Sequence, residues 1–99
     1  MTYSIELSEL AIDDIAEIQD WYRDHLNGLE KQFIVSLEGA FDQIAKNPLA
    51  FQVRIKQSRN ILLKRFPYKV IFKIYGSTIK IVAIIHHSRN PKSVRKRLK

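Results

Sequence analysis

The chain has 99 residues, of which 45% are hydrophobic and 27% are charged, and its formal net charge at pH 7 is +7. This length suits one domain, and we expect residues 1–99 to form a single unit with one core. The absence of cysteine excludes disulfides, thiolate nucleophiles and Cys-based zinc sites. The start shows no secretory pattern, and no apolar run approaches the ~20 residues that span a bilayer, so we expect a cytoplasmic protein without membrane contact.

The charges are segregated along the chain. All ten acidic residues lie at or before Asp42, whereas residues 51–99 hold 14 Lys and Arg and no acid. A half without carboxylates cannot neutralise its own cations in internal salt bridges. The sequence therefore predicts a surface that faces phosphate or an acidic polypeptide, or that is neutralised by counter-ions.

The acidic half reads as a strand followed by two helices. Alternation of apolar and polar residues over 3–7 predicts a short strand. Ser8 is a good N-cap, and apolar residues at helical spacing then predict a helix with an acidic outer side, which ends at Asn27-Gly28. A second apolar stripe from Leu29 predicts another helix, which Asn47-Pro48 ends. We expect the two helices to form an antiparallel hairpin.

The basic half reads as strands. Apolar runs separated by turn residues predict strands over residues 53–56, 61–66, 68–75 and 78–86. The last run is apolar on both faces and is expected in the centre of the sheet, and Pro91 can open a basic helix or tail. We therefore predict an α+β fold with an N-terminal strand, a two-helix antiparallel hairpin, a mainly antiparallel sheet of three to four strands, and a short C-terminal basic helix or tail.

A two-residue hairpin at Gly76-Ser77 fixes a register between the last two runs. It places Ile74 opposite Ile79 and Lys73 opposite Lys80. Strict alternation then gives one wholly apolar face, which is expected to lie on the helices, and one mixed cationic and aliphatic face. The mixed face is the candidate binding surface, and it holds Lys69, Ile71, Lys73, Tyr75, Lys80, Val82, Ile84 and His86.

The sequence carries no phosphate loop, no dinucleotide fingerprint and no zinc-protease helix. His86 and His87 are adjacent in a predicted strand and point to opposite faces, so they cannot readily hold one metal ion. We therefore expect no metal and no cofactor. Two interpretations of the pair stay open: one His is buried and the other lies at the sheet rim, or His86 transfers protons beside Arg89.

The many cations of the second half suit a phosphate backbone. The alternative is a solvated strand face on which Lys discourages edge-to-edge aggregation. The complete absence of acids favours binding, because solvated faces usually mix charges of both signs. The tail from Arg95 to Lys99 is either a disordered segment that counter-ions neutralise, or an element that contacts a partner directly.

The order of elements, the block Phe66-Pro67-Tyr68 and the block His86-x-x-Arg89-x-Pro91 resemble the RelE/ParE toxins, and the resemblance covers nearly the whole chain. Members of this family are toxins of bacterial type II toxin–antitoxin pairs. The resemblance implies a tightly bound, acidic antitoxin as partner. It also implies an indirect contact with operator DNA, because the toxin–antitoxin pair usually represses its own operon.

The family has two toxic activities. RelE-like members cleave mRNA in the ribosomal A site with a set of Lys, Arg and Tyr or His side chains. By position, Arg89 retains one Arg and Lys69 replaces another, but Asn60 and Leu62 stand where such enzymes carry Lys, and Arg95 stands where they carry Tyr.

ParE-like members lack that set and poison DNA gyrase. The resemblance thus favours a ParE-like gyrase inhibitor. The alternative is a ribosome-dependent mRNA endoribonuclease with Arg89, Lys69 and His86 at its centre. A basic nucleic-acid-binding module without toxicity is a third hypothesis.

The sequence predicts two contact regions for antitoxin or target. One is the mixed sheet face around Lys69, Lys73, Lys80 and Ile84. The other is the basic C-terminal segment with Arg95, Lys96 and Arg97, which is expected to be free of the packed core.

Overall fold

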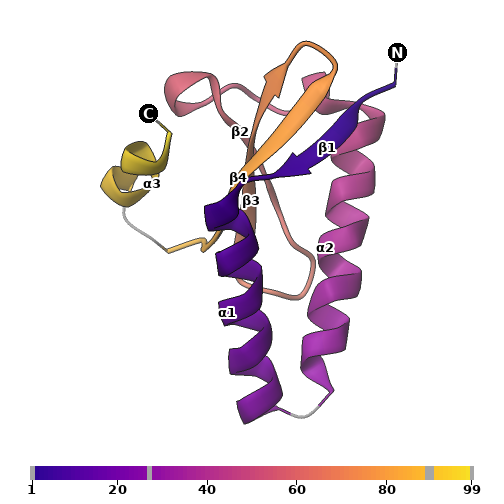
Figure 1. The fold of residues 1–99 in the computed structure, drawn as a ribbon, viewed down its shortest axis with the longest axis vertical. Coiled ribbons are helices and arrows are strands. Elements are labelled where there is room, and N and C mark those ends of the chain that lie inside the picture. The colour runs from indigo at the N-terminus through magenta and orange to yellow at the C-terminus, as the bar shows by residue number, and fades with distance from the viewer. Residues whose placement is uncertain (1, 27, 89–90, 99) are drawn as a thin grey trace.

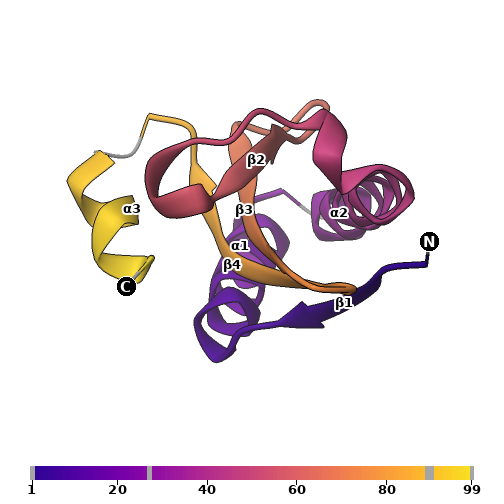
Figure 2. The ribbon, with the colours of Figure 1, turned by 90° about the horizontal axis from the view of Figure 1, so that it is seen from above.

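The computed structural model describes residues 2–26, 28–88 and 91–98. The helix hairpin covers one face of the sheet, and the short C-terminal helix lies on the other side (Figures 1 and 2). The predicted α+β arrangement is confirmed. The elements in chain order are β1 (Ser4–Leu7), α1 (Glu9–His25), α2 (Leu29–Lys46), 3-10 turns at Pro48–Ala50 and Ile55–Gln57, β2 (Arg59–Leu62), β3 (Tyr68–Tyr75), β4 (Thr78–His86) and α3 (Pro91–Arg97).

The sheet has the strand order β1-β4-β3-β2. The pairing of β1 with β4 is parallel, and the other two pairings are antiparallel. Strand β4 lies inside the sheet, as its two apolar faces predict. The core between this sheet and the hairpin is fully buried at Phe33, Ile44, Val70, Phe72, Ile79, Ile81 and Ile84.

Local signals set the helix ends. The Ser8 hydroxyl accepts a hydrogen bond from the Ala11 N–H at 3.1 Å and caps α1. Gly28 precedes α2 with φ +91°, a conformation that costs a glycine little. The helix of 18 residues that follows ends at Lys46, directly before Asn47-Pro48. None of the described helices combines the length and apolarity that a membrane crossing requires.

The first predicted strand of the basic half is wrong. Residues 53–56 do not pair, and the chain instead makes a 3-10 turn at Ile55–Gln57. Lys56 and Gln57 adopt left-handed conformations there, with φ values of 52° and 65°. The second predicted strand, over residues 61–66, is displaced, because β2 begins at Arg59 and ends at Leu62.

The predicted hairpin register is confirmed at its turn, where Lys73 lies opposite Lys80 and Ile74 opposite Ile79. Farther along, Phe72 pairs with Ile81 but Ile71 pairs with Ala83, so Val82 is an extra residue in β4. Such a β-bulge reverses the facing of every later residue in its strand.

The bulge corrects the predicted faces of the sheet. Ile84, which was expected on the exposed mixed face, is 2% exposed and lies in the core under the helices. Ala83 and Ile85, which were expected under the helices, lie with Ile71 on the other face. Strict alternation failed because it took no account of the inserted residue.

Helix α3 covers the middle of that second face. Val94 and Leu98 are 8% and 2% exposed, and both pack in a second cluster with Ile71, Ala83 and Ile85. The expectation that the basic C-terminal segment is free of the packed core is therefore wrong. A helix of seven residues is too short to be stable alone, so its shape depends on this contact.

An ion pair between the two halves of the chain fixes α3. The Arg97 guanidinium donates to both carboxylate oxygens of Asp14, each at 2.7 Å. The same carboxylate accepts the Ile84 N–H at 3.0 Å, and Arg97 also donates to the Val82 carbonyl at 3.5 Å. The Asp14 hydrogen bond raises the pKa of Arg97, so this guanidinium remains charged at every physiological pH.

We expect Arg97→Ala to lower the free energy of unfolding by about 2–4 kcal/mol, because it leaves the buried Asp14 carboxylate without its cation. Urea titration of both proteins measures the difference. Lys96→Ala is the matched control, since Lys96 is exposed on the same helix and its loss should change stability by less than about 0.5 kcal/mol. Equal losses in the two variants would show that the ion pair contributes nothing.

Lys73 and Lys80 lie directly opposite in adjacent strands, and opposed like charges are destabilising. We expect Lys73→Glu to raise the stability by roughly 0.2–1 kcal/mol. Lys73→Gln removes only the repulsion and should give a smaller rise. Thermal melts at low salt, repeated at 1 M salt, measure this order, and an unchanged or lowered melting temperature for both variants would contradict it.

Candidate functional site

Helix α3 leaves two clefts on the second face of the sheet. We call the larger one, of about 780 Å³, the Lys69 cleft; it is lined by Phe51, Gln52, Val53, Arg54, Ile55, Ser58, Asn60, Ile61, Leu62, Lys69, Ile71, His87 and Val94. The smaller one, of about 480 Å³, is the Lys73 cleft; it is lined by Glu6, Ser8, Leu10, Lys73, Tyr75, Thr78, Lys80, Val82, Arg97 and Leu98.

Hydrogen bonds hold the wall of the Lys69 cleft in place. The Arg54 N–H donates to the Ser58 carbonyl at 2.6 Å, and the buried Ser58 hydroxyl donates to the Ile55 carbonyl at 2.6 Å. The Arg59 guanidinium donates to the Phe51 carbonyl oxygen. Arg59 therefore ties the end of the other 3-10 turn, Pro48–Ala50, to β2 and is not a free cation of the binding surface.

The Lys69 cleft combines cations with apolar surface. Lys69 and Arg54 supply positive charge, and aliphatic side chains such as Ile55 and Ile71 supply much of the rest. No carboxylate is present among the described residues of its lining. Such a cleft suits an anionic group that carries an apolar part.

The candidate acid–base residues are distributed differently from the prediction. Lys69 lines the cleft, but His86 does not: its ring lies edge-on to Tyr68, with centroids 5.6 Å apart, and its Nδ1 accepts the Ser88 N–H at 3.2 Å. His87 lines the cleft with Lys69. Arg89 lies outside the described residues.

The bulge places His86 on the other face of the sheet from the one that the sequence predicts. His87 follows the last residue of β4, and its ring centroid lies 4.8 Å from that of His86, so the prediction that the two rings point to opposite faces is wrong. The extra Val82 turns His86 toward the helix side, where it pairs with Tyr68, and His87 lines the cleft. Neither histidine is buried.

The Lys73 cleft brings together Lys73 and Lys80, as the hairpin register predicts. It also contains Glu6, which lies opposite Lys80 in β1, so its charge is mixed. Arg97 lines this cleft while it is engaged by Asp14. The Lys69 cleft is therefore the more cationic of the two.

Sequence reasoning missed a third hollow, which lies between α2 and the segment after β2. This α2 groove has a volume of about 630 Å³ and is lined by Lys31, Gln32, Val35, Ser36, Gly39, Ala40, Gln43, Leu62, Leu63, Lys64, Arg65 and Phe66. Val35 and Leu62 are 68% and 63% exposed, although both are aliphatic. The only signal for it in the sequence was an apolar face of α2 that is wider than its buried stripe.

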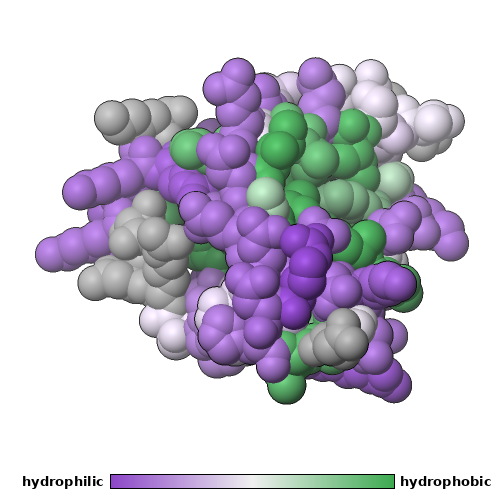
Figure 3. Space-filling model, turned by 60° about the horizontal axis from the view of Figure 1, so that its bottom comes forward, coloured by the Kyte–Doolittle hydropathy of each residue, from purple (hydrophilic) through white to green (hydrophobic). Residues whose placement is uncertain are grey.

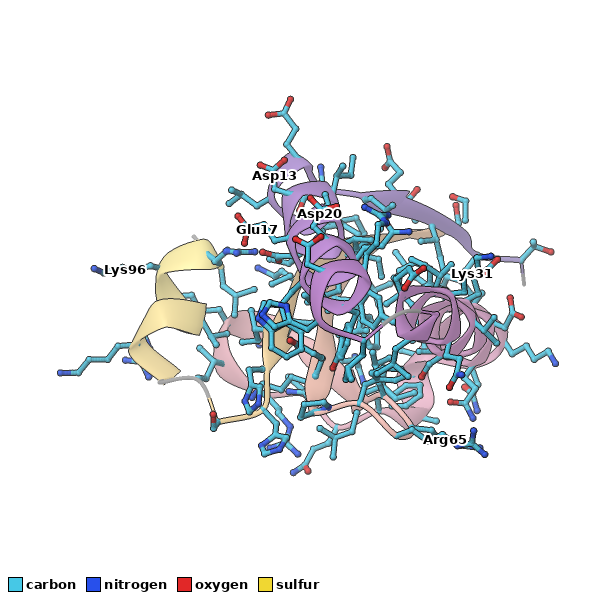
Figure 4. All side chains as sticks on the ribbon, turned by 90° about the horizontal axis from the view of Figure 1, so that it is seen from below. Asp13, Glu17, Asp20, Lys31, Arg65 and Lys96 are labelled. Atoms are coloured by element: carbon cyan, nitrogen blue, oxygen red, sulfur yellow. The ribbon has the colours of Figure 1, made fainter. Side chains whose placement is uncertain are left out.

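The surface charges are separated in space as well as in sequence. In Figure 4, Asp13, Glu17 and Asp20 lie together along α1. Lys31 and Arg65 lie on the side of α2, and Lys96 points outward from α3. Hydrophobic side chains gather in part of the face drawn in Figure 3, among hydrophilic neighbours.

The cations of α3 have different roles. Arg95 and Lys96 are exposed and available for contact, whereas Arg97 is held in the structure by Asp14. Within the described part of the chain, no three His, Asp or Glu side chains gather in a way that could hold a metal ion.

The chain is similar to known proteins in both sequence and fold. Over 95 residues the chain is 26% identical to the toxin ParE2 of Mycobacterium tuberculosis, which covers 95% of this chain and 90% of that protein.

Among solved structures, the chromosomal ParDE system of P. aeruginosa superposes with a TM-score of 0.76 at 18% identity, covering 86% of this chain and 96% of that one. The toxin RelE of E. coli in the free state gives 0.68 at 14% identity over the full length of both chains. The toxin–antitoxin complex RelBE2 of M. tuberculosis gives 0.55 at 16% identity, covering 87% and 99%.

These structural matches support the fold, since their sequence identities are low. The sequence family described as the ParE toxin of the type II toxin–antitoxin system parDE matches residues 5–91, which include α1, α2, β2, β3, β4, most of β1 and the cleft residues Lys69 and His87. The chain therefore belongs to the ParE toxin family, within the RelE/ParE superfamily of type II toxins.

Proposed function

We propose that this toxin inhibits DNA gyrase by binding it, and that it does not cleave RNA. The supporting observation is the composition of the Lys69 cleft. At Asn60 and Leu62, where RNA-cleaving relatives are expected to carry Lys, the cleft presents an amide and a methyl surface. The cleft keeps Lys69 and Arg54 for binding, but it lacks the two further cations that Lys side chains at positions 60 and 62 would supply to a phosphorane-like charge.

Binding to a protein–DNA intermediate requires a surface and no nucleophile. Arg95 and Lys96 on the exposed side of α3 suit contacts with DNA or an acidic protein surface. Each exposed cation contributes on the order of 1 kcal/mol or less. Inhibition should therefore depend on several such residues together.

We propose further that an acidic cognate antitoxin neutralises the toxin in the cytoplasm, and that the toxin reaches operator DNA only through this antitoxin. The support is the family membership, together with three hollows that each have cations in their lining. A small acidic protein encoded next to the toxin is the expected partner. Coexpression of the two should restore the growth that the toxin alone arrests.

We expect the purified toxin to inhibit supercoiling by gyrase and to accumulate cleaved DNA when the complex is denatured. Arg95→Glu combined with Lys96→Glu should weaken this inhibition by roughly tenfold, because it reverses two exposed charges. Lys46→Glu, at the exposed end of α2, is the control and should inhibit like the unaltered toxin. Unaffected gyrase at saturating toxin, with toxicity retained in cells, would exclude this target.

The second candidate function is a ribosome-dependent mRNA endoribonuclease. The observation that favours it is the presence of Lys69 and His87 in one cleft. An imidazole can exchange a proton with a ribose hydroxyl or a leaving oxygen, and a lysine can stabilise phosphate charge.

If this activity exists, Lys69→Ala and Arg89→Ala should each lower cleavage of ribosome-bound mRNA by ~10²–10³-fold, through lost stabilisation of phosphate charge. His87→Ala and His86→Ala, changed one at a time, test which of the two neighbouring imidazoles takes part in the cleavage. Primer extension on mRNA from toxin-expressing cells measures the cleavage. Toxin-dependent sites that vanish in the Lys69 variant would replace gyrase with the ribosome as the target.

A further inference from the structure

Two lysines with no counter-charge in contact lie side by side in the Lys73 cleft. Lys73 in β3 and Lys80 in β4 are directly opposite each other, and both line this cleft. Glu6 lies opposite Lys80 in β1, but the ion pairs among the described residues include neither lysine. The two ammonium groups therefore repel each other, and an anion that contacts both would turn this repulsion into attraction.

Hydrogen bonds hold the walls of the Lys73 cleft in place. The Ser8 N–H donates to the Ile81 carbonyl at 3.0 Å, and the Ser8 hydroxyl donates to the Val82 carbonyl at 3.1 Å. These bonds fix the start of α1 beside β4. On the opposite wall, the ion pair with Asp14 fixes Arg97 of α3. A ligand that enters the cleft therefore meets a pre-ordered surface, and binding costs little ordering of the protein.

The cleft also presents an exposed aromatic ring. Tyr75 is two residues after Lys73 in β3, so the two side chains point to the same face of the sheet. The residue is 57% exposed, although it is aromatic. Leu10 and Val82 add apolar surface to the lining. An exposed aromatic face of this kind suits a nucleobase, because every base can stack on it.

The size and the charge of the cleft limit the class of ligand. Its volume of about 480 Å³ lies within the range of roughly 300–1,000 Å³ that is usual for small-molecule sites. Asp14 neutralises Arg97, so two lysines face the one carboxylate of Glu6 and leave a net charge of +1. This balance suits a ligand with one phosphate group better than a polyphosphate.

We propose that the Lys73 cleft binds one nucleoside monophosphate unit, with its phosphate between Lys73 and Lys80 and its base against Tyr75. The two ammonium groups donate charge-assisted hydrogen bonds to the phosphate oxygens, and the ring of Tyr75 stacks on the base. A free nucleotide and a nucleotide within a DNA strand present this same chemistry. The site goes beyond the proposed inhibition of gyrase and does not depend on it.

Amide NMR spectra of the purified toxin locate the site. A deoxynucleoside monophosphate and a single-stranded tetradeoxynucleotide, added separately, should shift the signals of residues 73–80 and leave those of Asn60 and Leu62 at the Lys69 cleft unchanged. Shifts with both ligands support a nucleotide from either source, and shifts with the strand alone identify DNA as the source. Unchanged signals over residues 73–80, or changes at the Lys69 cleft in their place, would overturn the proposal.

Single substitutions test the role of each side chain. Lys73→Gln and Lys80→Gln should each raise the Kd for the nucleotide roughly fivefold, because each removes one of two cations. Tyr75→Ala should raise it roughly tenfold and leave the binding of inorganic phosphate unchanged, since only stacking is lost. Glu6→Gln removes a repelling carboxylate and should tighten binding about twofold. Lys46→Gln, at the exposed end of α2, is the matched control and should bind normally.

Thermal melts give a readout that unrelated surface lysines would not produce. The nucleotide should raise the melting temperature of the unaltered toxin, because it binds the folded state. Without ligand, Lys73→Gln should melt higher than the unaltered toxin, since the repulsion from Lys80 is gone, yet it should gain far less from the nucleotide. An equal gain in both proteins would overturn the bridging of the two lysines. Equal affinity for inorganic phosphate and for the nucleotide would overturn the stacking on Tyr75.

Discussion

The ion pair between Asp14 and Arg97 determines how the second face of the sheet is divided. Asp14 comes from α1, Arg97 from α3, and both contact the backbone of β4 beside its bulge. A helix of seven residues has little intrinsic stability, so its position depends on this pair and on the two apolar side chains beneath it. Because α3 separates the Lys69 cleft from the Lys73 cleft, one interaction fixes the shape of both.

The Asp14–Arg97 ion pair also joins the acidic half of the chain to the basic half. The basic half contains no acid, but the fold brings an acid of the first half to it, and Glu17 and Asp13 also raise the pKa of Arg97. Among the described cations, Arg54 and Lys69 line the Lys69 cleft, and Lys31, Lys64 and Arg65 line the α2 groove. An acidic partner is therefore attracted to one side of the molecule and repelled by α1, which favours one orientation of binding.

The helices, the central strand and the hairpin turn could be predicted because each has a local signal: a cap, a period or a turn dipeptide. The sheet faces of Ile84 and of the His86-His87 pair could not be predicted. One extra residue in β4 reverses these faces, and an apolar run of residues gives no sign of such an insertion. Asp14 has a signal in the sequence, since this acidic residue lies on the apolar stripe between Ala11 and Ile18. Its partner is 83 residues away, and no local pattern identifies it.

The composition of the Lys69 cleft agrees with the proposed role in binding. Its described lining has one imidazole and no carboxylate, so it offers no acid–base pair of two such groups. Desolvated aliphatic surface slows the dissociation of a complex. The surrounding cations speed its formation and favour a partner of negative charge. Lys73 in β3 and Lys80 in β4 repel each other and lower the stability of the sheet, and a sheet with a purely structural role would not need this pair. We infer that this cost is retained because the cations serve recognition.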